Sequence, residues 1–196
     1  PSAGACQGMY TANTMACLAE VMGMSLPYCS SASAVSSKKR RIAFDSGMQI
    51  VELVKKDIKP SDIITRESLR NAIVADLALG GSTNTFLHIL AIANAGGIDV
   101  TLNDFEELSG KIHQIVKINP SSTLTMADFH NAGGIPATMK SLEKFLSDTK
   151  TVSGISTKEI AKQAWADNAI IPEYDQSSYT QAGLSILYGN LAKDGC

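Results

Sequence analysis

Charged side chains are scarce in this sequence. They make up 18% of the 196 residues, whereas an average soluble domain has about 25%. The 17 basic and 19 acidic residues leave a net charge of -2, and the one dense basic cluster is Lys38–Arg41. A protein that binds nucleic acid through bulk charge is therefore excluded. No apolar run approaches the roughly 20 residues of a membrane helix, so we expect no membrane partner.

Cysteine is scarce as well, with four residues in the chain: Cys6, Cys17, Cys29 and Cys196. No Cys-x-x-Cys pair occurs, which excludes a zinc ribbon and a thioredoxin-type motif. Four cysteines are also too few for a disulfide scaffold of this length. No signal-peptide pattern is visible. We therefore expect a cytoplasmic chain with reduced thiols, or an organellar one if the source is eukaryotic.

The sequence does have apolar residues at helical spacing, punctuated by glycine. The hydrophobic share of 44% excludes a disordered chain. The pattern predicts an α/β fold that is dominated by helices and has a few short strands. The expected helices span 11–22, 37–57, 66–79, 83–95, 101–113, 125–133, 136–146 and 157–166. The expected strands span 151–155, 170–171 and 184–187.

Caps and glycines set the limits of these helices. The predicted N-caps are Thr65, Ser82 and Thr157, the predicted stops are Gly23 and Gly80–Gly81, and capping boxes are expected at Thr101–Asp104 and Thr125–Asp128. In the helix at 37–57 we expect a buried stripe made of Ile50, Val51, Val54 and Ile58. The helix at 83–95 is apolar nearly all round, so we expect burial on most of its sides.

Cys6 is the first candidate for chemistry, because it stands between Gly4 and Gly8 just before a helix. The helix dipole favours a thiolate at that position. The residue is then a nucleophile or a metal-cluster ligand; the alternative is a small buried cysteine in a tight turn. Cys17 lies 11 residues further on, about 16 Å away along a helix, so both cannot bind one cluster. Cys29 is on a loop, and no spacing connects it to such a site.

A second candidate is the turn that carries Ser82, Thr83 and Asn84. Glycines before a helix offer backbone N–H groups to an anion, and these three side chains add donors. A simple helix break with an N-cap is the structural alternative. No Walker loop and no Gly-x-Gly-x-x-Gly fingerprint is present. His88 follows Asn84 on the same helix face, and His130 precedes a glycine pair; both are also explained as structural histidines.

Several stretches resemble dihydroxy-acid dehydratases. The string GACQGMYTANTM at 4–15 is similar to the signature of that family. Later blocks agree in order: PSDIITR at 60–66, ALGGSTN at 78–84 followed by LH at 87–88, DFHNAGGIP at 128–136, GL at 183–184 and GNLA at 189–192. The blocks extend over nearly the whole chain.

The resemblance implies a hydro-lyase that removes water from 2,3-dihydroxy acids to give 2-oxo acids in valine and isoleucine biosynthesis. Such enzymes carry magnesium and an iron–sulfur cluster, here with 2Fe–2S favoured over 4Fe–4S, and are usually homodimers. Cys6 matches the last of three cluster cysteines. We expect Ser82, Thr83, Asn84, His88 and His130, which lie in the matching blocks, beside the substrate or in structural roles.

The chain is about a third of a family member. The resemblance assigns 1–169 to the later half of the N-terminal cluster-binding domain, and 170–196 to a segment leading toward a β-rich C-terminal domain. The other cluster cysteines, the magnesium-binding residues and the serine base match no part of this sequence, so we expect no catalytic residue here. Gln7 replaces a frequent glycine. We therefore expect the isolated chain to be inert and to bind no native cluster.

Two other functions stay open at this stage. A sugar-acid dehydratase would share the chemistry, and a non-catalytic helical interaction module would keep the sequence without the activity. The low charge is consistent with a surface that other segments normally cover. That interpretation predicts exposed apolar patches on the isolated chain.

Overall fold

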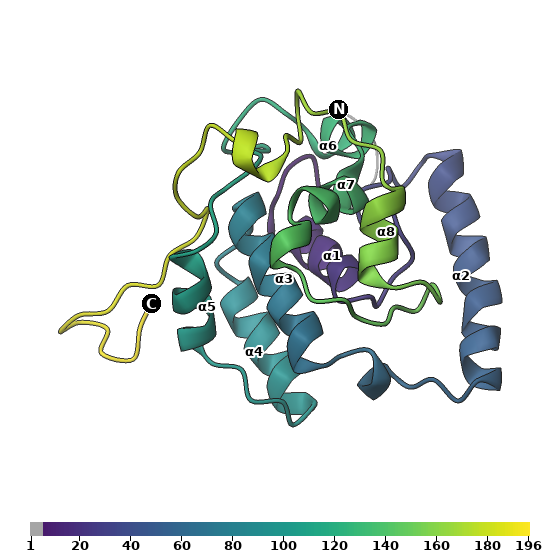
Figure 1. The fold of residues 1–196 in the computed structure, drawn as a ribbon, viewed down its shortest axis with the longest axis horizontal. Coiled ribbons are helices and arrows are strands. Elements are labelled where there is room, and N and C mark those ends of the chain that lie inside the picture. Colours follow the sequence, from purple (N-terminus) through teal and green to yellow (C-terminus); the bar gives the residue numbers. More distant parts are fainter. Residues whose placement is uncertain (1–5) are drawn as a thin grey trace.

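The computed structural model of the chain describes residues 6–196 and is built almost entirely of helices and loops (Figure 1). The α-helices are α1 (Thr11–Val21), α2 (Ser37–Lys55), α3 (Arg66–Leu79), α4 (Thr85–Ala95), α5 (Leu102–Ser109), α6 (Met126–Asn131), α7 (Gly134–Ser141) and α8 (Thr157–Gln163). Single 3-10 turns are η1 (Pro60–Asp62), η2 (Glu143–Phe145) and η3 (Tyr174–Gln176). The helix-dominated character predicted from the sequence is therefore confirmed.

Helix α1 forms the centre of the molecule. It contacts α3, α4 and α7, and α8 packs on α7 (Figure 1). Cys17, Leu18 and Val21 of α1 are fully buried. The largest buried side chains around them come from the surrounding helices and include Leu69, Ile73, Leu77, Ile89, Phe105, Phe129, Ile135 and Met139. One apolar core thus surrounds the helix that follows the Cys6 motif.

Most predicted helix limits are confirmed by their cap geometry. Thr65 accepts a hydrogen bond from Ser68 N, and both capping boxes predicted from the sequence are present, at the starts of α5 and α6. Gly23 and Gly80 have positive φ values of 84° and 61° at the ends of α1 and α3. These positions favour glycine because a Cβ is strained in the left-handed region.

Two predicted caps are wrong. Ser156, not Thr157, caps α8, since its hydroxyl accepts from the backbone of that helix. α4 begins at Thr85 with Asn84 in the N-cap position, and the Ser82 hydroxyl, which contacts Thr11, accepts a hydrogen bond from Asn84 N ahead of the helix. The limits of three helices are also wrong: α5 stops at Ser109 rather than near 113, α7 spans Gly134–Ser141 rather than 136–146, and α8 stops at Gln163 rather than near 166.

The predicted strands are not found in residues 6–196. Pairing of β type occurs in the tail, as an isolated bridge between Gly189 and Ala192 and as the two backbone hydrogen bonds that Leu187 and Cys196 exchange. A strand needs a ladder to a neighbouring extended segment. Val152 N donates to Gly23 O at a helix end, 170–171 form a turn, and 184–187 lie in the tail without a ladder. A largely buried segment at 112–118, which the sequence did not indicate, also forms no ladder: Ile115 N donates to Ala78 O and Gln114 N donates to Gln181 O.

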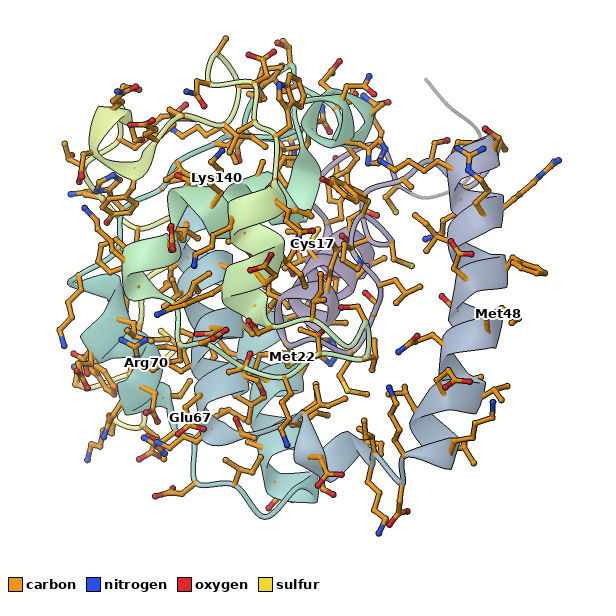
Figure 2. The ribbon with its side chains drawn as sticks, turned by 45° about the vertical axis from the view of Figure 1, so that its right-hand side comes forward. Cys17, Met22, Met48, Glu67, Arg70 and Lys140 are labelled. Atoms are coloured by element: carbon orange, nitrogen blue, oxygen red, sulfur yellow. The ribbon has the colours of Figure 1, made fainter. Side chains whose placement is uncertain are left out.

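The predicted burial of α2 is also wrong. The helix runs along one side of the molecule (Figures 1 and 2), and its inner face buries Ile42 and Leu53. Val51 and Val54, expected in the core, are 49% and 72% exposed, Ile50 is exposed and Ile58 is half-buried. α4 is likewise open on one side, where Leu87 is exposed. These exposed apolar residues confirm the patches that the low charge predicted.

None of the helices described here combines the length and the apolarity that crossing a membrane requires.

Candidate functional site

Cys6 lies in a turn that leads directly into α1. The buried Asn13 side chain donates 2.6 Å hydrogen bonds to the carbonyl oxygens of Cys6 and Gly8. A Cβ on Gly8 would lie 2.1 Å from the carbonyl oxygen of Asn119, and Met9 N donates to that same oxygen over 2.7 Å. Hydrogen bonds from Asn13 therefore hold the turn, and the missing side chain of Gly8 allows the turn to approach Asn119 closely.

The Cys6 side chain is exposed, so the alternative of a small buried cysteine in a tight turn is wrong. It borders a cavity of about 30 Å³ that is also lined by Asn13, Met126, Ala127 and the serine-rich segment 30–33. Tyr10, the N-cap of α1, makes no side-chain cap, so no side chain of the cap competes for the N–H groups of the first helical turn. Gly4, which precedes the thiol in the predicted motif, lies outside the described residues.

Glu20 holds the serine-rich segment in place from inside the core. Its carboxylate accepts hydrogen bonds from Tyr28 N (2.6 Å), Ser30 N (2.9 Å) and Ser30 Oγ (2.6 Å). Burial raises the pKa of Glu20 to about 7, although the hydrogen bonds from Ser30 and Tyr28 and the charge of Lys39 lower it. One wall of the Cys6 cavity thus depends on a buried carboxyl that the sequence did not single out.

His130 lies behind the same wall. Its Nδ1 is 2.8 Å from the hydroxyl oxygen of Ser31, and its ring meets that of Tyr28 edge to face. Burial, and then the charge of Lys38, lower the pKa of His130. Gly134 permits the contact, because a Cβ there would lie 2.6 Å from Ser31 Oγ. The structure therefore connects His130 to the Cys6 cavity through Ser31.

The turn at 80–84 meets α1 at its first residue. Ser82 Oγ and Asn84 Nδ2 lie 2.9 and 2.8 Å from Thr11 Oγ1, so three polar side chains gather at one helix start. Thr83 is exposed in the same turn, and so is His88, one helical turn beyond Asn84. The predicted grouping of Ser82 with Asn84 is thus present near the Cys6 turn.

Asp76 lies beneath this turn, fully buried in α3. Its Oδ2 is 2.5 Å from Thr85 Oγ1, while its Oδ1 has no hydrogen-bond partner among the described residues. Burial raises the pKa of Asp76 to about 7, and the hydrogen bond from Thr85 lowers it. Gly81 makes room for the carboxyl, since a Cβ there would lie 2.2 Å from Oδ1.

The remaining cysteines do not join Cys6. Cys17 is buried, and its burial raises the pKa of the thiol to about 12, with a further increase from Glu20. Figure 2 shows this side chain inside the helical body. Cys29 is half-buried with its Sγ 3.5 Å from Lys39 Nζ. Within residues 6–196, no three His, Cys, Asp or Glu side chains group as a metal site.

A larger cavity, of about 930 Å³, lies elsewhere, between α7, α8 and the segment at 163–175. It is lined by Lys140, Lys144, Trp165 and Tyr174 among others, and by none of the residues that the sequence singled out. Lysines and carboxylates line it together, and Lys144 is paired with Asp175. Because the larger cavity contains none of the predicted site residues, we place the candidate site at Cys6 and the start of α1.

This arrangement offers one exposed thiol and a neighbouring group of hydroxyl and amide donors. Sequence reasoning singled out Cys6, Ser82 and Asn84, but it missed Asn13 and Thr11 as the residues that connect them. Asn13 and Thr11 have only their polar character as a signal, which they share with Thr14 and Glu20 of the same helix. The burial of Glu20 and Asp76 has no comparable signal in the sequence.

Comparisons with known proteins give a consistent result. The family model described as "Dihydroxy-acid/6-phosphogluconate dehydratase N-terminal" matches residues 1–160. The chain is 52% identical to a dihydroxy-acid dehydratase of Endomicrobium trichonymphae and 52% identical to one of Thermodesulfovibrio yellowstonii, each over 196 residues. It is 50% identical over 198 residues to one of Methanococcus maripaludis (strain C5 / ATCC BAA-1333). Each match covers 100% of this chain and 36% of the relative, so the chain spans about a third of their length.

Proposed function

The chain belongs to the dihydroxy-acid/6-phosphogluconate dehydratase family, and on this basis we propose that it forms part of an iron–sulfur hydro-lyase. The reaction removes the C2 hydrogen and the C3 hydroxyl of a 2,3-dihydroxy acid as water and leaves a 2-oxo acid. The observation that carries the proposal is the exposed Cys6 thiol, held by Asn13 in a turn that only glycine at position 8 permits.

Cys6 fits the role of one cluster ligand. A ligand thiol must be accessible, and the Cys6 side chain is exposed on a backbone turn that Asn13 holds through the Cys6 carbonyl. One cysteine cannot hold a cluster, and residues 6–196 contain no group of three metal-binding side chains. The other cluster ligands would therefore come from outside these residues.

The neighbouring polar side chains would position the substrate. When bound, the cluster and a magnesium ion supply Lewis acids for the departing hydroxyl and the carboxylate. Ser82 and Asn84, joined through Thr11, present donors that would orient a hydroxy acid at the start of α1. Thr83 and His88 lie exposed beside them, and His130 supports the cavity wall from behind. The serine base and the magnesium ligands belong to parts of the enzyme beyond this segment.

The names of the relatives support one substrate class over the other. The family description covers both dihydroxy-acid and 6-phosphogluconate dehydratases, but the relatives described above carry the first name. We therefore favour the branched dihydroxy acids of valine and isoleucine synthesis over sugar acids. The assignment of a 2Fe–2S cluster belongs to the same proposal.

The arrangement of the parent enzyme is also proposed. Residues 1–169 would complete an α/β N-terminal domain with segments that precede them, and 170–196 would lead toward a β-rich C-terminal domain. The buried extended segment at 112–118 would then join a sheet that the parent supplies. A cytoplasmic homodimer completes the proposal. The isolated chain would be inert, so reconstitution with iron and sulfide should give no native cluster and no turnover.

A graft tests the function. Residues 1–196 replace the matching segment of the Thermodesulfovibrio yellowstonii enzyme, and the purified graft is assayed anaerobically with 2,3-dihydroxyisovalerate. We expect release of the 2-oxo acid at a rate within about tenfold of the unaltered host. A graft that folds and binds iron but does not dehydrate this substrate would contradict the proposal and favour a non-catalytic interaction module.

A further inference from the structure

The proposed function does not use the buried carboxyl of Asp76. Asp76 is fully buried, and the structure gives it no cationic partner among the described residues. Oδ1 lacks a hydrogen bond, as does the buried hydroxyl of Thr14 on α1. An ionised carboxylate in such a place would leave a charge uncompensated, which is costly in a protein interior.

The contacts of Thr85 bear on the protonation state. Thr85 Oγ1 lies 2.5 Å from Asp76 Oδ2 and also 2.6 Å from the carbonyl oxygen of Ser82. Each of these distances requires a proton between the two oxygens, because oxygens without one do not approach so closely. The Thr85 hydroxyl has a single proton, and the Ser82 carbonyl has none to give. The second proton can therefore come only from Asp76.

We propose that Asp76 is a neutral carboxylic acid that donates to Thr85, which in turn donates to Ser82 O, so that the chain of bonds positions the turn at 80–84. Asp76 is then a positioning residue for Ser82 and Asn84. The claim that the turn contacts substrate rests on the proposed function. The protonation of Asp76 and its effect on the position of the turn are properties of this chain alone and do not depend on the proposed function.

The surroundings of Asp76 are consistent with a neutral acid. α1 presents Thr14 to it, α4 presents Thr85, and the turn presents Gly81. No charged group of the described residues contributes to its titration, and burial, the largest effect, raises its pKa to about 7. The nearest buried acid on α1, Glu20, faces Tyr28 and Ser30 instead.

The test is an NMR titration of the chain labelled with ¹³C at aspartate carboxyl carbons. We expect one signal to keep the shift of a neutral acid at pH 5.5, where exposed aspartates are ionised, and to titrate near pH 7. Asp76→Asn removes this signal. Thr85→Val displaces it and Thr85→Ser leaves it unchanged, which assigns it even if Asp76→Asn fails to fold. A signal for Asp76 that titrates near 4 with the others would overturn the proposal.

Amide hydrogen exchange tests whether the hydrogen bonds through Thr85 stabilise the turn at 80–84. After correction for intrinsic rates, exchange at 81–85 should increase about threefold or more between pH 6 and pH 8 in the unaltered chain, because ionisation breaks the chain of bonds. Asp76→Asn keeps a donor to Thr85, so its exchange should not change over this range. The same pH dependence in both proteins would refute the positioning role. Neither the NMR titration nor the exchange measurement depends on dehydratase activity. A negative result in them would therefore refute the role of Asp76 without bearing on the proposed function.

Discussion

The side-chain amide of Asn13 donates a 2.6 Å hydrogen bond to the carbonyl oxygen of Cys6. A second bond from the same nitrogen reaches Gly8 O, also over 2.6 Å. These bonds join the thiol-bearing turn to the helix that forms the centre of the core. The position of Cys6 therefore depends on a residue that contributes no chemistry of its own.

Replacement of Asn13 should loosen this turn. In Asn13→Ala the two carbonyl oxygens lose their donor, which should lower the free energy of unfolding by about 1–3 kcal/mol. Urea denaturation of the chain measures the change. Asn94→Ala, an exposed position on α4, is the matched control and should change stability by less than about 0.5 kcal/mol. Equal effects of the two substitutions would contradict the role assigned to Asn13.

Two glycines should respond in opposite directions to alanine. A Cβ on Gly8 would lie 2.1 Å from the backbone oxygen of Asn119, so Gly8→Ala should destabilise the chain by about 1–3 kcal/mol. Gly47 lies inside α2, and a Cβ there would meet nothing within 4 Å. Gly47→Ala should therefore raise stability by about 0.5–1 kcal/mol. Thermal unfolding checks both; a stabilising Gly8→Ala would refute the packing described here.

Glu20 should make stability dependent on pH. Its pKa is raised by burial from 4.5 to about 7, so the folded chain holds the proton more tightly than the unfolded chain. Its contribution to the free energy of unfolding is thus largest below about pH 4.5, falls as pH rises, and levels off above about 7. Urea denaturation from pH 4.5 to 8 should show a smaller slope for Glu20→Gln than for the unaltered chain. Glu52→Gln, at an exposed position, should keep the original slope.

The outer face of α2 should cause self-association of the isolated chain. Phe44, Met48 and Val54 are exposed there by 71%, 61% and 72%. Light scattering and an apolar dye should detect this surface, and the double change Phe44→Lys with Val54→Lys should abolish both signals with stability within about 0.5 kcal/mol. Leu53→Lys, on the buried face, should instead unfold the helix. If the unaltered chain is monomeric and binds no dye, the result would contradict the interpretation that other segments normally cover this face of α2.

Helix limits could be predicted from the sequence wherever a local signal decides them. Thr65 and Gly80 enclose α3 because a cap and a left-handed glycine act on the nearest turn of backbone. The strands at 151–155 and 184–187 were wrong, because a strand depends on a partner that is distant in the sequence. α2 shows the same limitation, since the apolar character of Val51 and Val54 does not reveal which segment covers them.

The candidate site divides in the same way. Cys6, Ser82 and Asn84 could be singled out because their types and neighbouring glycines are local features. The connection through Thr11, and the burial of Asp76 between α1 and α4, arise from packing between segments about 70 residues apart and have no local pattern. Asp76 alone looks like an ordinary helical aspartate.

The most direct test of the account is the iron and sulfide content and the dehydration rate of the graft with Cys6→Ser, compared with the graft carrying Cys29→Ser. We predict that Cys6→Ser lowers both cluster content and turnover of 2,3-dihydroxyisovalerate by at least about a hundredfold. Cys29→Ser, at a residue that does not line the cavity, should retain both. A Cys6→Ser graft with an intact cluster and normal turnover would contradict the assignment of Cys6 as a cluster ligand.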